Sequence, residues 1–132
     1  MREVLDTRFF AVHYTSKDAG ILDRTRGRLA QLRRERRGLI PAIVVAETAY
    51  FVCREGGKQK ALASTRAMEV SGLDIVPLDA ETAREAGLLK CTYRDVPMAD
   101  CIIAATALRE DGCVVSNDPH FSRIKGLRVT WV

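Results

Sequence analysis

Short apolar segments alternate with helical segments along the whole chain, and this alternation constrains the fold more than any other feature. Strands are expected at residues 3–5, 39–42, 73–78, 113–116 and 127–132. The spacing of apolar residues between them predicts helices over 16–37, 43–52, 58–71, 79–93 and 98–110. No Asn-Gly or similar hairpin signal joins neighbouring strands. The pattern therefore predicts an α/β fold with a mostly parallel sheet and helices on both faces.

Length and composition narrow the class of protein. A chain of 132 residues has the size of one ordinary domain, so we treat 1–132 as a single domain. A composition of 47% hydrophobic and 29% charged residues excludes a disordered or fibrous protein. No apolar run approaches the roughly 20 residues that span a bilayer, and the first residues lack the pattern of a signal peptide. We expect a soluble cytoplasmic protein with no membrane partner.

The cysteines suggest no metal site, whereas the net charge bears on the kind of partner the protein binds. Cys53, Cys91, Cys101 and Cys113 lack the close pairing of a zinc site, and we interpret them as reduced, structural thiols. The net charge of +4 makes a polyanionic partner plausible, although richness in arginine can equally reflect the base composition of a genome.

Arginine is concentrated in the segment 24–37, which holds seven of the chain's sixteen arginines. The guanidinium group suits phosphate, so this helix is a candidate for contact with a nucleic-acid strand. The alternative is a solvated helix face. The candidate RNA-binding residues are Arg24, Arg28, Arg33, Arg34 and Arg37. Aromatic residues are few, so the sequence gives little sign of base-by-base recognition.

Glu47 stands out because it lies within the apolar run IVVAETAYFV, residues 43–52. The run offers no evident polar face, and an unpaired carboxylate out of water costs several kcal/mol, so Glu47 requires a partner. That partner is either an arginine in a structural ion pair or a cation held jointly with other acids.

Four acids are expected to lie together at the carboxyl ends of the strands, which is where open parallel sheets bind ligands. These candidate catalytic and metal-binding residues are Asp6, Glu47, Asp100 and Asp118. Three of them also have structural roles available when taken singly, since Asp6 suits a helix cap, Asp100 a first helical turn and Asp118 a turn before proline.

Carboxylates brought together repel one another unless protons or cations lie between them. Mg²⁺ and Mn²⁺ prefer oxygen ligands, whereas zinc favours histidine and cysteine, which do not cluster here. Thr7, Ser116 and Asn117 flank the acids and can orient carboxylates or metal-bound waters, or can simply form turns. Such a site beside arginines suits hydrolysis of phosphodiester bonds. The contribution of His120 and Asp95 stays open.

Four motifs carry a resemblance to a known family. The segments LDT with Asp6, VVAE with Glu47, ADCIIAATAL with Asp100 and SNDPHF with Asp118 resemble the acidic motifs of the PIN-domain family. The likeness spans nearly the whole chain and is greatest to the small VapC toxins of VapBC toxin–antitoxin systems. In two places the chain departs from the family pattern. Ser116 stands where threonine is frequent, and residues 42–45 lack the serine or threonine often found before the glutamate, which leaves the support of Glu47 open.

The resemblance implies an α/β/α sandwich and a Mg²⁺- or Mn²⁺-dependent endoribonuclease. It also implies inhibition by a small VapB-like antitoxin whose C-terminal segment covers the active site, and a homodimer. The alternatives are a noncatalytic RNA-binding or scaffolding module and a housekeeping RNA-processing nuclease. A phosphoacceptor receiver domain ranks lower, because Asp6 has no adjacent acidic partner.

Overall fold

A five-stranded parallel sheet forms the middle of the protein in a computed structural model that describes residues 1–132. The strand order is β3-β2-β1-β4-β5, and every neighbouring pair is parallel. The strands are β1 (Glu3–Leu5), β2 (Gly38–Pro41), β3 (Asp74–Val76), β4 (Cys113–Val115) and β5 (Arg128–Thr130). The predicted parallel sheet is therefore confirmed.

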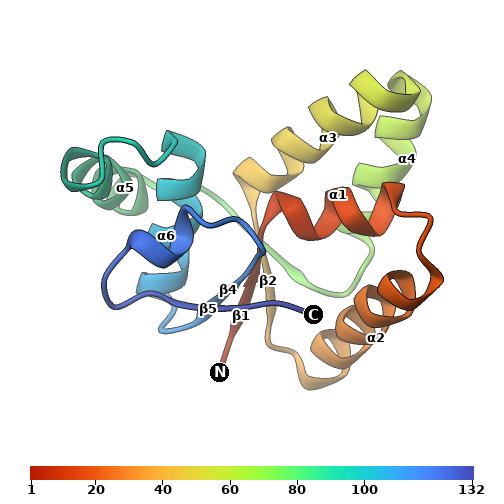
Figure 1. Cartoon of the computed structure of the whole chain (residues 1–132), viewed down its shortest axis with the longest axis horizontal. Coiled ribbons are helices and arrows are strands. Elements are labelled where there is room, and N and C mark those ends of the chain that lie inside the picture. Colours follow the sequence, from red (N-terminus) through yellow and green to blue (C-terminus); the bar gives the residue numbers. More distant parts are fainter.

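Helices cover both faces of this sheet. Figure 1 shows α1 to α4 on one side and α5 and α6 on the other, which confirms the three-layer α/β/α architecture. The helices are α1 (Thr7–Thr15), α2 (Ala19–Glu35), α3 (Ala42–Gly56), α4 (Lys58–Glu69), α5 (Ala80–Thr92) and α6 (Met98–Arg109), and a short 3₁₀ helix, η1 (Phe121–Arg123), follows β4. No helix combines the length and the apolar character needed to cross a membrane.

The N-terminal helices differ from the expected pattern. The predicted helix over 16–37 begins only at Ala19, because the Asp18 carboxylate accepts hydrogen bonds from the amides of Gly20 and Ile21. Ser16 ends α1 instead. Helix α1 has many β-branched and aromatic residues, which favour helices poorly, and it is stabilised by the burial of Phe9 and Phe10.

The core lies on both sides of β1, the central strand, whose three residues are all buried. Helix α6 is the most deeply buried helix, and its small side chains Ala104, Ala105 and Ala107 lie within the core. None of the four cysteines is in a disulfide. The strand order reverses at β1 and β4, since β2 and β3 lie on one side of this pair and β5 on the other. Such a reversal opens a crevice at the carboxyl ends of the two strands.

Candidate active site

Four acidic side chains that are far apart in the sequence line one pocket at this crevice. Asp6 follows β1, Asp118 follows β4, and Glu47 and Asp100 lie in the first two turns of α3 and α6. The pocket has a volume of about 250 Å³ and is lined by Asp6, Thr7, Arg8, Ala11, Glu47, Phe51, Asp100 and Asp118. The expected convergence of the acids is present, and their catalytic role stays a prediction.

Asp6 is held by Ser116, the residue that follows β4. The Ser116 hydroxyl donates to Asp6 Oδ2 at 2.6 Å, and the Asp118 amide donates to the same hydroxyl oxygen at 3.0 Å. Asp6 stands at the N-cap of α1 without a side-chain capping hydrogen bond, and the Ser116 hydroxyl is the side-chain donor that holds its carboxylate. Burial raises the pKa of Asp6, and the hydrogen bond from Ser116 opposes that rise.

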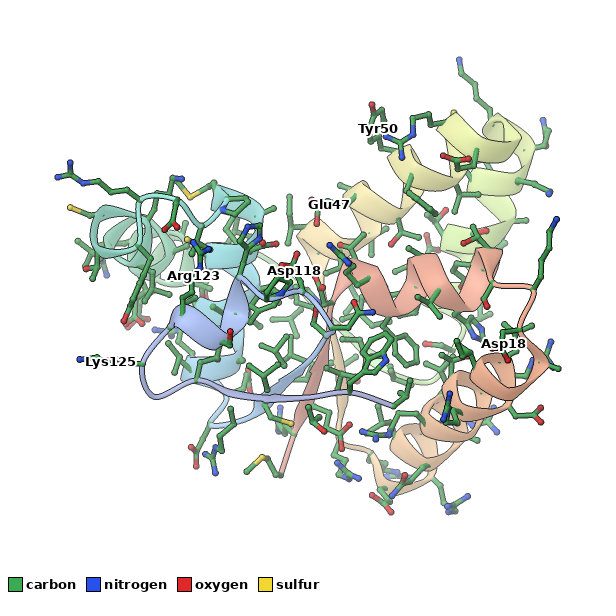
Figure 2. All side chains as sticks on the ribbon, in the orientation of Figure 1. Asp18, Glu47, Tyr50, Asp118, Arg123 and Lys125 are labelled. Carbon is green, nitrogen blue, oxygen red and sulfur yellow. The ribbon has the colours of Figure 1, made fainter.

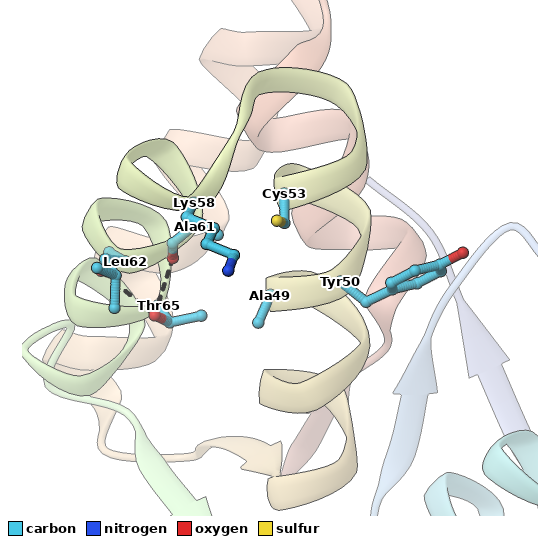
Figure 3. A pocket seen from close by; sticks show the side chains of 7 residues that line it. All are labelled: Ala49, Tyr50, Cys53, Lys58, Ala61, Leu62 and Thr65. Carbon is cyan, nitrogen blue, oxygen red and sulfur yellow. Dashed lines mark hydrogen bonds between the residues drawn. The ribbon is translucent and has the colours of Figure 1, made fainter.

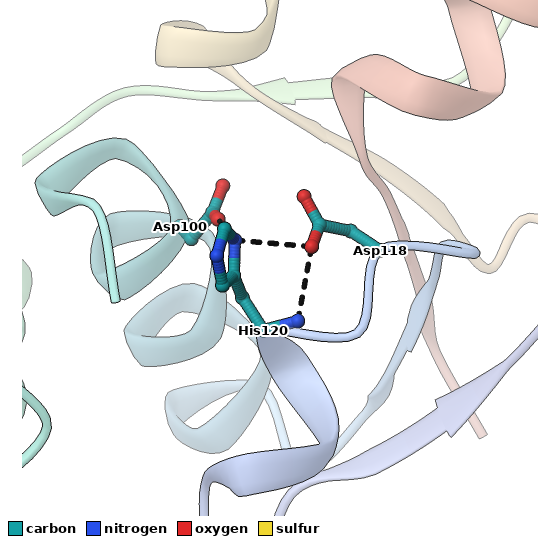
Figure 4. A group of neighbouring side chains, drawn as sticks. All are labelled: Asp100, Asp118 and His120. Carbon is teal, nitrogen blue, oxygen red and sulfur yellow. Dashed lines mark hydrogen bonds and ion pairs between the residues drawn. The ribbon is translucent and has the colours of Figure 1, made fainter. Parts of the chain in front are cut away.

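Asp100, Asp118 and His120 form the tightest group in the pocket region (Figure 4). The Nδ1 atom of His120 lies 3.0 Å from Asp100 Oδ2 and 3.0 Å from Asp118 Oδ1. The His120 amide also donates to Asp118 Oδ1, so Asp118 shapes its turn as well as facing the pocket. Burial, followed by the negative charges of Asp118 and Asp6, raises the pKa of Asp100 to about 6, although His120 acts against the rise.

Glu47 is half-buried, and its partner is Thr7. The Thr7 hydroxyl donates to Glu47 Oε1 at 2.7 Å, and no arginine forms an ion pair with this carboxylate. The expectation that no polar face is available was wrong, because Ala46 and Tyr50 are exposed while Val44 faces the core. The structure thus offers the hydroxyl support that the residues just before Glu47 do not supply.

Sequence reasoning missed Arg8 and left His120 undecided. Arg8 Nε lies 3.8 Å from Asp118 Oδ2, and 53% of the arginine side chain is exposed, which leaves it free to meet a ligand. Its place two residues after Asp6, on the first turn of α1, was the available signal. Asn117 is exposed and lies outside the pocket lining, and Asp95 is exposed and forms an ion pair with Arg123.

The arginines of α2 are not brought to the acids. Arg28 of α2 and Arg37, just after that helix, form ion pairs with Glu3, which begins β1 and so lies at the opposite end of the strands from the acids. The other three candidates, Arg24, Arg33 and Arg34, are exposed on α2. None of the five lines the acidic pocket. Their contact with RNA stays a prediction, and at most it would take place away from the acids.

The donor set fits a hard divalent cation. Three of the acids and His120 are linked by hydrogen bonds or short contacts, and one donor atom from each of Asp100, Asp118 and His120 lies within 4.8 Å of the other two. Burial, and then the negative charges of Asp118 and Asp6, raise the pKa of Asp100, so its ionised form is destabilised, and a bound cation would relieve that cost. Carboxylate oxygens dominate the donors, as Mg²⁺ and Mn²⁺ prefer.

Comparison with protein-family models and with solved structures found proteins similar to this chain. A family model described as the PIN domain matches residues 4–127. Among solved structures, the VapBC2 complex of Rickettsia felis, bound to a promoter DNA fragment, is similar with a TM-score of 0.80 and 23% identity over 99% of this chain and 98% of that chain. DNA-bound VapBC of Salmonella typhimurium gives a TM-score of 0.78 and 23% identity over the same shares.

A third similar structure is VapC20 of Mycobacterium tuberculosis, described as a toxin that cleaves the sarcin–ricin loop. Its TM-score is 0.72, with 18% identity over 92% of this chain and 93% of that chain. At these identities the solved structures establish the fold alone. A comparison with curated protein sequences gave no match.

Proposed function

Because the chain belongs to the PIN-domain family, we propose that it is a Mg²⁺- or Mn²⁺-dependent endoribonuclease that hydrolyses phosphodiester bonds in RNA. The observation that carries the proposal is the convergence of Asp6, Glu47, Asp100 and Asp118 from four separate segments on one pocket. A scaffold protein has no physical reason to crowd four carboxylates, since the repulsion costs stability unless a cation is bound.

The carboxylates of these four acids would bind the cation. When bound, the cation supplies an activated water and stabilises charge on the phosphate oxygens. Ser116 fixes the Asp6 carboxylate and Thr7 fixes that of Glu47, each through a hydroxyl hydrogen bond. These contacts limit rotation of the carboxylates and so preorganise the metal ligands.

Two further side chains are placed to act on RNA or on the acids. Arg8 is half-exposed beside Asp118 and can pair with a phosphate of the substrate as its guanidinium group leaves the weak 3.8 Å contact. His120 lies between Asp100 and Asp118, where its Nδ1 atom is within hydrogen-bond distance of both carboxylates and can orient them.

The direct test is cleavage of single-stranded RNA by the purified protein with Mg²⁺ or Mn²⁺, which a chelator should stop. Asp6→Asn and Asp100→Asn should each lower the rate by at least about a hundredfold. Asp95→Asn is the matched control, because Asp95 is an exposed acid near α6 that lies outside the pocket. Undiminished cleavage by both Asp6→Asn and Asp100→Asn would refute the proposal.

Calorimetry with Mn²⁺ separates the nuclease from a noncatalytic RNA-binding module. A nuclease of this kind should bind the ion with an affinity that falls in Glu47→Gln, while the stability of the metal-free protein changes little. A scaffold would show no ion binding that depends on Glu47.

We further propose that the protein is the toxin of a type II toxin–antitoxin pair, acts in the cytoplasm as a homodimer and is inhibited by a small VapB-like antitoxin that covers the acidic pocket. The similarity to VapBC complexes over nearly the whole chain supports this assignment. Expression of the protein alone should arrest growth, and expression with the product of a short neighbouring gene should restore it. A housekeeping nuclease would show neither effect.

A further inference from the structure

We propose that Tyr50 and Arg54 of α3 form a nucleobase-binding surface at the mouth of the acidic pocket, on which an unpaired base of the RNA stacks. The inference rests on the proposed ribonuclease function and deepens it, because it names the part of the substrate that the protein holds beside the acids. Nothing in the sequence alone pointed to base stacking.

The periodicity of α3 brings the surface next to the acids. Tyr50, Phe51 and Arg54 follow Glu47 by three, four and seven residues, so they continue the same helix face. Glu47 and Phe51 both line the acidic pocket. Figure 2 shows Glu47 and Tyr50 projecting from the same side of α3. Glu47 and Tyr50 are three residues apart on α3, a rise of about 5 Å, so a base on Tyr50 would lie about one or two nucleotides from a phosphate in the pocket.

The Tyr50 ring is available for a ligand. Tyr50 is 68% exposed, although a tyrosine of a folded core usually buries most of its ring. A second, apolar pocket of about 400 Å³ lies between α3 and α4. Tyr50 contributes to its rim, but Figure 3 shows that the ring turns away from Lys58 and Leu62 of α4. Packing between the two helices thus does not account for the position of the ring.

Arg54 adds a positive charge to this aromatic surface. Its guanidinium carbon lies 5.5 Å from the centre of the Tyr50 ring and 5.6 Å from that of Phe51, which is cation–π distance for both. The contact restrains the two rings and places a positive charge beside them. Aromatic faces bind bases by stacking whatever the base, and an adjacent arginine binds the backbone of the same strand.

Size and charge favour a nucleobase over a second copy of the chain. A single exposed tyrosine offers about 150–250 Å², whereas a stable dimer buries on the order of 800 Å² per partner. The apolar surface here is the Tyr50 ring together with the lining of the small pocket between α3 and α4, which stays well below the area of a dimer interface. A flat base matches the ring, and a phosphate next to it can pair with the exposed Arg54 guanidinium in place of Glu55, whose carboxylate lies 3.4 Å from Arg54 Nε.

The test measures binding of a single-stranded RNA of about 12 nucleotides in which adenines are replaced by fluorescent 2-aminopurine. Binding is measured with Asp100→Asn protein, which should not cleave the probe. Tyr50→Ala should weaken binding roughly tenfold and remove the fluorescence quenching that marks stacking. Tyr50→Phe should retain both, and Leu62→Ala is the matched control, because Leu62 is similarly exposed on α4 and should change neither.

A second probe set carries one abasic residue at successive positions. One position should lower affinity for the parent protein and leave affinity for Tyr50→Ala unchanged, since the ring and the base act as a pair. Equal losses at every position, unchanged binding by Tyr50→Ala, or a changed oligomeric state of that variant without RNA would overturn the inference. Failure of the wild-type protein to cleave RNA would overturn the proposed function alone, if binding that depends on Tyr50 and the base persists.

Discussion

Replacement of Asp100 by asparagine should stabilise the metal-free protein while it abolishes activity. The side chain of Asp100 is only 13% exposed, and burial together with the charges of Asp118 and Asp6 raises its pKa from 3.8 to about 6. A rise of about two pKa units corresponds to about 3 kcal/mol at neutral pH, at roughly 1.4 kcal/mol per unit. Asparagine removes this charge and can still accept a hydrogen bond from His120, so the free energy of unfolding should rise by about 1–3 kcal/mol.

The effect should depend on pH with a defined sign. The folded-state pKa of Asp100 lies above its unfolded value, so protonation of the carboxyl group stabilises the folded protein at low pH. That stabilisation is lost as the pH rises through about 6. The variant carries no such group, and its advantage should therefore grow from about pH 4 to about pH 6 and remain constant above.

Thermal unfolding followed by circular dichroism, with a chelator present, measures this difference. Each kcal/mol corresponds to about 3–4 °C for a chain of this size, so the melting temperature should rise by about 3–12 °C at neutral pH. Asp95→Asn should change stability by less than about 0.5 kcal/mol, because that acid is exposed. A variant that is equally or less stable than the wild type at neutral pH would refute the argument that burial and the neighbouring charges destabilise the ionised Asp100 carboxylate.

Three other substitutions test the supports of the site and of the fold. Ser116→Ala should destabilise the protein by about 1–3 kcal/mol in urea unfolding, because it leaves the buried Asp6 carboxylate without its hydroxyl donor. Thr7→Val should lower Mn²⁺ affinity in calorimetry by about 10- to 100-fold, since it frees the carboxylate of Glu47, and an unchanged affinity would remove Thr7 from the site. Gly112→Ala should destabilise the protein by about 1–3 kcal/mol, as its Cβ would meet a backbone carbonyl oxygen just before β1 at 2.5 Å, and a wild-type melting temperature would contradict that clash.

The sequence predicted the sheet and the meeting of the acids because both follow from local patterns combined with one general property of parallel sheets. Helix α1 was not predicted, because the interactions that stabilise it are not local in the sequence. The segment from Thr7 to Thr15 has weak helix formers, and its helix depends on the burial of Phe9 and Phe10 against elements that come much later in the chain.

The surroundings of the acids were predictable only in part, for the same reason. The motif before His120 placed this residue near Asp118, but its contact with Asp100 depends on how η1 lies against α6. The arginine-rich segment indicated a phosphate-binding helix, whereas Arg28 and Arg37 are engaged by Glu3. The sequence shows how many arginines this segment has, but only the fold shows which of them already form ion pairs within the protein.

The central position of β1 means that the acidic pocket cannot exist on a partly synthesised chain. Asp6 leaves the ribosome early, but its hydrogen-bond donor Ser116 lies 110 residues later, on the segment after the neighbouring strand β4. A nascent chain must therefore be translated past Asp118 before the four carboxylates can meet. Under the proposed function, the cell that makes this nuclease is exposed to its activity only once almost the whole chain has emerged, and an antitoxin already present then has a complete pocket to cover.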